Sequence, residues 1–135
     1  MSQFTVGKRY RRSYSPPGLM VLRGPKEKYE PGSHWVVGDK HGYAELRLMN
    51  DSKAYNANSL YIENIVVKEP LRGRGYGREL YQKIERFAQN IGTDYIQIDS
   101  ESDVIGFWHN MGFKELDVVY YQNKTAMNMK LRKPS

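Results

Sequence analysis

Glycine and arginine alternate at residues 72–78, in the run Arg-Gly-Arg-Gly-Tyr-Gly-Arg, and these residue types fit a defined chemical task. Glycine lacks a side chain, so Gly73, Gly75 and Gly77 let the backbone approach a ligand closely. The apolar spacing downstream predicts a helix, and the first turn of a helix has amide groups without partners inside the helix. The helix dipole and the three arginine side chains both favour an anion, so we expect a pyrophosphate to bind here.

Two common glycine-rich nucleotide motifs do not match this segment. The phosphate-binding P-loop requires a Gly-Lys-Ser/Thr ending, and no such run occurs. The dinucleotide fingerprint requires a third glycine where this chain has Arg78 or Leu80. Arginine-glycine stretches also bind RNA, but they are usually disordered, and this one is expected between a strand and a helix. A tight turn with solvated arginines is the remaining structural alternative.

Two elements must hold the arginine-glycine segment in place. Residues 60–67 are apolar on both faces and rich in β-branched side chains, which is typical of a central strand, and Pro70 marks its end. Apolar residues at helical spacing predict a helix over residues 75–91, which Gly92 can end. The segment is therefore expected as the loop that joins this strand to this helix.

The rest of the chain is expected to add short strands and one further helix. Alternating apolar and charged residues predict a hairpin whose turn is residues 38–42. An apolar stripe predicts a second helix over residues 104–111, which Ser102 or Asp103 can cap and Gly112 can end. The other expected strands are residues 4–10, 19–23, 34–37, 43–49, 95–100, 113–121 and 125–131.

Length and charge indicate one globular domain with a basic start. The 135 residues are 39% hydrophobic and 27% charged, which suits a single domain, with a core over residues 34–131. Of the net charge of +6, residues 1–33 carry +5, from seven Lys/Arg and two Asp/Glu. This irregular basic segment could meet phosphates or an acidic protein face, and a solvated strand edge is the alternative.

The composition also argues against several classes of site and location. The chain has no cysteine, so thiolate metal sites and a cysteine nucleophile are excluded. His34, His41 and His109 lack zinc-site spacing, and no bound metal is expected. No apolar stretch is long enough for a membrane span, and the first residues lack the apolar centre of a signal peptide. We therefore expect a cytoplasmic protein with no membrane partner.

Two segments of the chain resemble known family motifs in the right order. Residues 65–78 resemble motif A of the GNAT superfamily of N-acetyltransferases, [RQ]-x-x-G-x-[GA] after a central strand, with Arg72, Gly75 and Gly77 at its fixed positions. Residues 106–113, Gly-Phe-Trp-His-Asn-Met-Gly-Phe, resemble the family's second element, a short helix ending in an aromatic, followed by three residues and then Gly-Phe.

The resemblance implies an α+β fold: a mixed, mostly antiparallel twisted sheet of six or seven strands, splayed at the central strand, with two main helices and a reduced N-terminal region. It also implies acetyl-CoA as cosubstrate, with the pantetheine arm on the backbone of Ile65 and Val67 and the pyrophosphate on the amides of residues 73–78. A strand amide near Val67 would stabilise the oxyanion. The implied coenzyme-binding residues are Ile65, Val66, Val67, Arg72, Gly73, Arg74, Gly75, Tyr76, Gly77, Arg78, Glu101 and Trp108.

Two positions depart from the family pattern. Trp108 stands where the family commonly has a tyrosine, which is often proposed to protonate the departing thiolate, and an indole cannot do this well. Glu101 stands where many members have an asparagine that contacts the coenzyme. The proton would then come from Tyr120, Tyr121 or water, or transfer would proceed without a dedicated acid.

The implied reaction is direct attack of an amine on acetyl-CoA in a ternary complex. An amine with a pKa near 10 must first lose a proton. Glu63 is the first candidate for the base, because strand alternation places it on the same face as Ile65 and Val67. A charge pair with a neighbouring strand is its alternative role, and Asp99, Glu101 and Glu45 are weaker candidates for the base.

The basic N-terminal segment favours a protein amine over a cationic small molecule as the acceptor, because like charges repel. The alternative function is a catalytically silent GNAT-fold protein that binds a protein or nucleic acid through residues 1–33. An RNA-binding module built on the arginine-glycine turn would require the helix over residues 75–91 to be absent.

Overall fold

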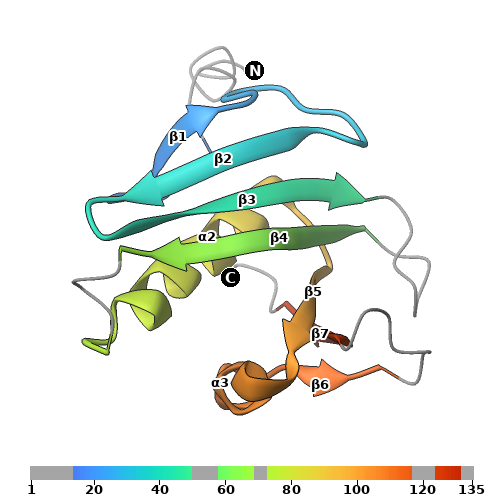
Figure 1. Ribbon diagram of the computed structural model, residues 1–135. Helices are drawn as coiled ribbons and strands as arrows, with labels where there is room; N and C mark the ends of the chain where they lie inside the picture. Colours follow the sequence, from blue (N-terminus) through green and yellow to red (C-terminus); the bar gives the residue numbers. More distant parts are fainter. Residues whose placement is uncertain (1–13, 50–57, 69–72, 117–123, 132–135) are drawn as a thin grey trace.

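Seven strands form a single sheet in the computed structural model, which describes residues 14–49, 58–68, 73–116 and 124–131 (Figure 1). The order is β1-β2-β3-β4-β5-β7-β6, and β4–β5 is the one parallel pair. The elements are β1 (Met20–Arg23), β2 (His34–Asp39), β3 (Gly42–Met49), β4 (Ser59–Val67), α2 (Tyr76–Ile91), β5 (Tyr95–Glu101), the 3₁₀ turn η2 (Ser102–Val104), α3 (Ile105–Asn110), β6 (Lys114–Glu115) and β7 (Lys124–Lys130). The predicted mixed, mostly antiparallel sheet with two helices is confirmed, while the expected strand 4–10 lies outside the described residues.

The β2–β3 hairpin has the alternation that its sequence predicts. Trp35 lies opposite Leu46, and these side chains are buried, whereas Arg47 on the other face is exposed. The turn is tighter than expected, because β2 continues to Asp39 and β3 starts at residue 42. Asp39 explains the difference, because its Oδ1 accepts hydrogen bonds from the amides of His41 at 2.8 Å and Gly42 at 3.1 Å.

Helix α2 packs against β3, β4 and β5 and lies behind β3 and β4 in Figure 1. Its buried residues are Leu80, Tyr81, Ile84, Phe87, Ala88 and Ile91. The Phe87 ring meets Trp35 edge to face with centroids 5.3 Å apart, so helix and sheet interlock at the centre of the core. Gly92 ends the helix with a left-handed φ of 93°. Neither helix in the described ranges is long and apolar enough to cross a membrane.

The second helix differs from its prediction at the start. Residues Ser102–Val104 form a 3₁₀ turn, and α3 begins only at Ile105. Neither Ser102 nor Asp103 acts as a cap, because the residues that precede the two segments are Glu101 and Val104, without a side-chain cap bond. Gly112 follows the helix with a φ of 104°, as expected. Strand β7 begins one residue earlier than predicted, and most of the expected strand 113–121 lies outside the described residues.

An additional residue in β4 changes the pairing of the central strand. Glu45 lies opposite Asn64, whereas its neighbour Leu46 lies opposite Ile62, so Glu63 is the extra residue of a β-bulge. The parallel pairing with β5 ends at the same place, with Ile62 opposite Ile98. Beyond that point β4 continues to Val67 without β5 beside it, which is the splay expected at the central strand.

An ion pair ties the β2–β3 turn to α2. Lys83 Nζ lies 2.9 Å from Asp39 Oδ2, and the Asp39 side chain is only 4% exposed. Burial alone would raise the pKa of Asp39, but the Lys83 hydrogen bond and charge and the two turn amides hold it below its ordinary value of 3.8.

We predict that Asp39→Asn lowers the free energy of unfolding by about 1–2 kcal/mol at pH 7. Because the folded pKa is depressed, the Asp39 contribution is present above the ordinary value of 3.8 and is lost as the pH falls through the folded value. The difference between wild type and variant should therefore shrink in acid. Urea unfolding across pH tests this, with the exposed Asp94→Asn as control; a difference that stays constant into acid would contradict it.

Candidate active site

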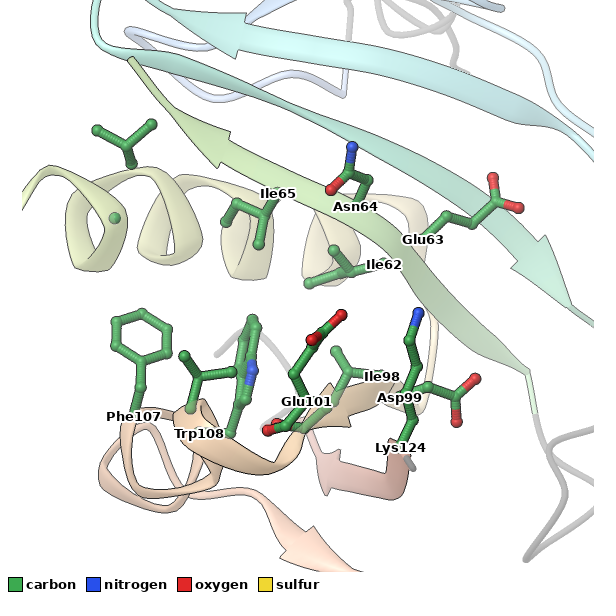
Figure 2. Close-up of a pocket in the computed structure, with 14 residues that line it drawn as sticks. Ile62, Glu63, Asn64, Ile65, Ile98, Asp99, Glu101, Phe107, Trp108 and Lys124 are labelled. Atoms are coloured by element: carbon green, nitrogen blue, oxygen red, sulfur yellow. The ribbon is translucent and has the colours of Figure 1, made fainter. Parts of the chain in front are cut away.

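A pocket of about 360 Å³ occupies the split between β4 and β5 (Figure 2). The wall on the β4 side includes Asn64, Ile65 and Val67, and α3 contributes Phe107 and Trp108. The other lining residues are Ile62, Glu63, Gly77, Ile98, Asp99, Ser100, Glu101, Val104 and Lys124. The pocket thus has apolar walls with several charged groups at one side, an arrangement typical of small-molecule sites.

The edge of β4 that faces the split offers backbone groups to a ligand. The Lys68 amide donates to the His41 carbonyl at 2.9 Å, so Lys68 and Val66 direct their amides towards β3. By alternation the Ile65 amide faces the split. Ile65 and Val67 also line the pocket, whereas Val66 lies opposite Tyr43 and does not. Such a strand edge can pair with an extended ligand as an added strand does.

The start of α2 is open to the same pocket. Gly75 precedes the helix with a φ of 82°, and no side chain caps the helix. A Cβ placed on Gly73 or Gly75 would meet no atom of the described residues within 4 Å, so in this part of the chain side chains do not crowd the turn. Gly77 lines the pocket, where a Cβ would lie 3.6 Å from a methyl group of Val67. The amides of the first turn have no partner inside the helix, and the helix dipole adds partial positive charge, so this end of α2 suits an anion.

The remaining predicted residues of this segment surround the helix start. Arg74 and Arg78 are exposed. The Tyr76 ring stacks on His41, with centroids 3.5 Å apart and planes 6° apart, which links the helix start to the β2–β3 turn. Arg72 lies outside the described residues.

Trp108 forms the floor of the pocket on the α3 side. Its side chain is 6% exposed and packs edge to face against Tyr81 and Phe113, with centroids 5.7 and 5.1 Å away. This packing fixes the indole as a wall. Glu101 lies exposed at the end of β5 and lines the same pocket.

Glu63 does not share a face with Ile65 and Val67, so that prediction is wrong. The bulge adds one residue, which breaks the two-residue alternation on which the prediction depended. Its carboxylate lies 3.1 Å from Arg47 Nη2 and 2.8 Å from His34 Nε2, on the polar face of the sheet. In Figure 2 it points from β4 towards that face.

A second, smaller pocket of about 220 Å³ lies on this polar face and is lined by Arg47, Met49, Tyr61, Glu63, Gln97 and Asp99. Glu63 and Asp99 line both pockets, so two carboxylates stand at the junction. The Tyr61 hydroxyl donates to Asp99 Oδ2 at 2.6 Å. Burial and this hydrogen bond raise the pKa of Tyr61 well above its ordinary value of 10, so Tyr61 remains a neutral donor. The chemistry available at the junction is proton acceptance by a carboxylate.

The weaker base candidate Glu45 and the histidine His109 lie elsewhere. Glu45 accepts a hydrogen bond from Asn64 at 3.3 Å and lines neither pocket. His109 pairs with Glu115 at 3.1 Å at the surface.

Lys124 also lines the main pocket and was not among the residues predicted from the sequence. It was expected in a turn, but it is the first residue of β7 and lies opposite Glu101. Figure 2 shows its side chain extending from β7 towards β4. No local signal could have found it, because its position depends on the register between β5 and β7.

Comparison with known proteins agrees with this architecture. Residues 5–113 match the family model described as "Acetyltransferase (GNAT) family", and the chain therefore belongs to this family. The chain is also similar to N-alpha-acetyltransferase 80 of Mus musculus, with 34% identity over 98 residues. That match covers 73% of this chain but only 28% of the relative.

Solved structures share the fold. The crystal structure of Tetrahymena GCN5 matches with a TM-score of 0.58 and 16% identity, covering 76% of this chain and 70% of that one. The crystal structure of the NatC complex bound to Gag peptide and CoA matches with a TM-score of 0.59 and 18% identity, covering 73% and 71%. At these identities the likeness establishes the fold.

We predict that the Ile65 amide exchanges with deuterium faster than the Val66 amide in the free protein, because only Val66 directs its N–H to β3. Residue-resolved NMR measures both exchange rates, and Val66 serves as the control because it is the neighbouring residue on the same strand. Equal, strong protection of both amides would mean that the split is closed in solution.

Proposed function

We propose that this chain is an acetyl-CoA-dependent N-acetyltransferase in which an amine attacks the acetyl group directly in a ternary complex. The observation that carries the proposal is the pocket in the β4–β5 split beside the uncapped start of α2. Membership of the GNAT family supports the reaction class. The similarity to the mouse N-alpha-acetyltransferase 80 supports amine acetylation, and the NatC complex, which was solved with CoA, supports coenzyme use for this fold.

In the proposed complex the pantetheine arm lies along the β4 edge at Ile65 and Val67. The pyrophosphate lies over the amides of residues 73–78, where Arg74 and Arg78 add positive charge. Arg72 would belong to the same site. The acetyl oxygen accepts a hydrogen bond from a strand amide near Val67, which stabilises the oxyanion as the amine attacks.

Glu63 is the proposed base. Its carboxylate stands where the coenzyme pocket meets the pocket on the polar face, so an amine entering from that face reaches the acetyl group past Glu63. Arg47 and His34 hold the carboxylate in one orientation. Glu63 would accept the amine proton directly or through one water molecule. The competing role is a charge pair that only joins β2, β3 and β4.

A protein amine is the proposed acceptor. The mouse relative is named for α-amine acetylation, and the NatC structure contains a peptide. Glu63 lines the pocket on the polar face, so a peptide end bound there would lie beside its carboxylate. The basic residues 1–33 would repel a small cationic metabolite.

Trp108 favours a second candidate function, a catalytically silent member of the family that binds a protein or nucleic acid through residues 1–33. Its indole lines the pocket where a proton donor is common in the family, and it is not an acid. Acetyl-CoA that binds but is never consumed with any peptide amine would support this candidate.

We predict that acetyl-CoA raises the Tm of the protein and that Arg78→Glu weakens coenzyme binding about tenfold, through one lost charge contact with the pyrophosphate. Arg86→Glu is the matched control, because it makes the same charge change at an exposed site two turns further along α2. Calorimetry measures both affinities. If the two variants bind acetyl-CoA with equal affinity, the proposed position of the pyrophosphate at the start of α2 is wrong.

We predict that Glu63→Gln lowers kcat/KM for a peptide with a free α-amine by about 100-fold at neutral pH. The loss should narrow as the pH rises towards the pKa of the amine, because the free amine then needs no base. Glu45→Gln is the control on the same face, outside both pockets. If kcat/KM of Glu63→Gln changes with pH in parallel with that of wild type, Glu63 is not the base and has only a structural role in its ion pairs.

A further inference from the structure

Trp108 lines the pocket but cannot donate a proton to the departing sulfur. When the acetyl group leaves coenzyme A, the sulfur departs as a thiolate, and protonating it assists the step. Among the described residues that line the pocket, few side chains have a proton that they could donate to the sulfur. The Ser100 hydroxyl already donates to the Glu101 carbonyl at 2.8 Å and is a very weak acid. The carboxylates of Glu63 and Asp99 can accept protons but in that form supply none.

Lys124 is the one cation among the described residues that line the pocket. Its side chain leaves the first residue of β7 and extends across the split towards β4, with the nitrogen at its tip (Figure 2). None of the ion pairs formed within the described ranges includes Lys124. The ammonium group is therefore available to a ligand in the pocket.

We propose that Lys124 is the general acid of the reaction, which protonates the departing thiolate of coenzyme A. This inference rests on the proposed acetyltransferase function and assigns the proton donor that the family pattern lacks here. In this fold the donor reaches the sulfur from β7, on the far side of β5, while Trp108 serves as a wall.

The charges around Lys124 suit this role. Glu63 on β4 and Asp99 and Glu101 on β5 line the same pocket, and neither α2 nor α3 adds a charged lining residue within the described ranges. The same carboxylates oppose a negative sulfur, so an ammonium beside the leaving group offsets a repulsion that the pocket itself creates.

The proposed step balances in atoms and charge. The amine nitrogen forms a bond to the acetyl carbon, and its proton passes to Glu63 or water. The carbon–sulfur bond then breaks with its electron pair on sulfur, and a proton moves from Lys124 Nζ to sulfur. Coenzyme A leaves as the thiol and the new amide leaves as product. Glu63 then gives its proton to water and neutral Lys124 takes one from water, so both side chains return to their starting state.

The thiol of bound coenzyme A tests this without any acceptor. We expect the ammonium to lower the pKa of the bound thiol by about one unit relative to Lys124→Gln, as a nearby opposite charge does. Ultraviolet titration of the thiolate in protein saturated with coenzyme A measures the value. Lys114→Gln, an exposed lysine on neighbouring β6, should match wild type. If all three proteins bind coenzyme A with the same thiol pKa, Lys124 has no role, although the proposed function stands. If none binds coenzyme A, the proposed function and this inference both fail.

Kinetics separates proton donation from charge alone. Lys124→Arg keeps the charge, but a guanidinium does not release its proton at neutral pH. With a peptide that has a free α-amine, we expect both Lys124→Arg and Lys124→Gln to lose about 10- to 100-fold in kcat with little change in KM for acetyl-CoA. Full activity of Lys124→Arg would overturn the proposal. The proposal would also be overturned if Lys124→Gln kept the wild-type kcat while Tyr120→Phe or Tyr121→Phe lost most of it.

Discussion

The additional residue in β4 at Glu63 is the constraint on which the site depends. It shifts the register with β3 at the place where pairing with β5 ends, so β4 and β5 separate beyond Ile62 and Ile98. Separation leaves a strand edge without a neighbour in the middle of a sheet, which a folded protein avoids unless something else pairs with it. The packing of Phe87 on α2 against Trp35 and the ion pair at Asp39 join α2 to the β4 side of the opening, and α2 also contacts β5 on the other side.

The same bulge connects the two faces of the sheet. It turns the Glu63 carboxylate to the polar face while leaving it at the rim of the main pocket, where Asp99 also lies. In the proposed reaction the coenzyme occupies the split and the acceptor approaches from the polar face. The amine and acetyl group then meet beside carboxylates from β4 and β5, with the Lys124 cation across the opening. Such an arrangement lets base and acid act from opposite sides of the reacting carbon.

Much of the fold could be predicted from local patterns. The alternation in residues 43–49 and the helical spacing in residues 75–91 depend on short-range periodicity, and both elements formed as predicted. The bulge could not be found this way, because residues 60–67 are apolar on both faces and only the register with β3 reveals the extra residue. The wrong face assigned to Glu63 follows from that. Lys124 was missed for a similar reason, since strand pairing far along the chain brings it to the pocket.

A crystal structure of the chain with acetyl-CoA would be the most direct measurement. We expect the pantetheine arm to lie between the Ile65 edge of β4 and the end of β5, with the pyrophosphate over the first amides of α2. Coenzyme bound instead in the groove that Lys40 and Gln89 line on the outer side of α2 would contradict this. So would a complex in which β4 and β5 stay paired beyond Ile62.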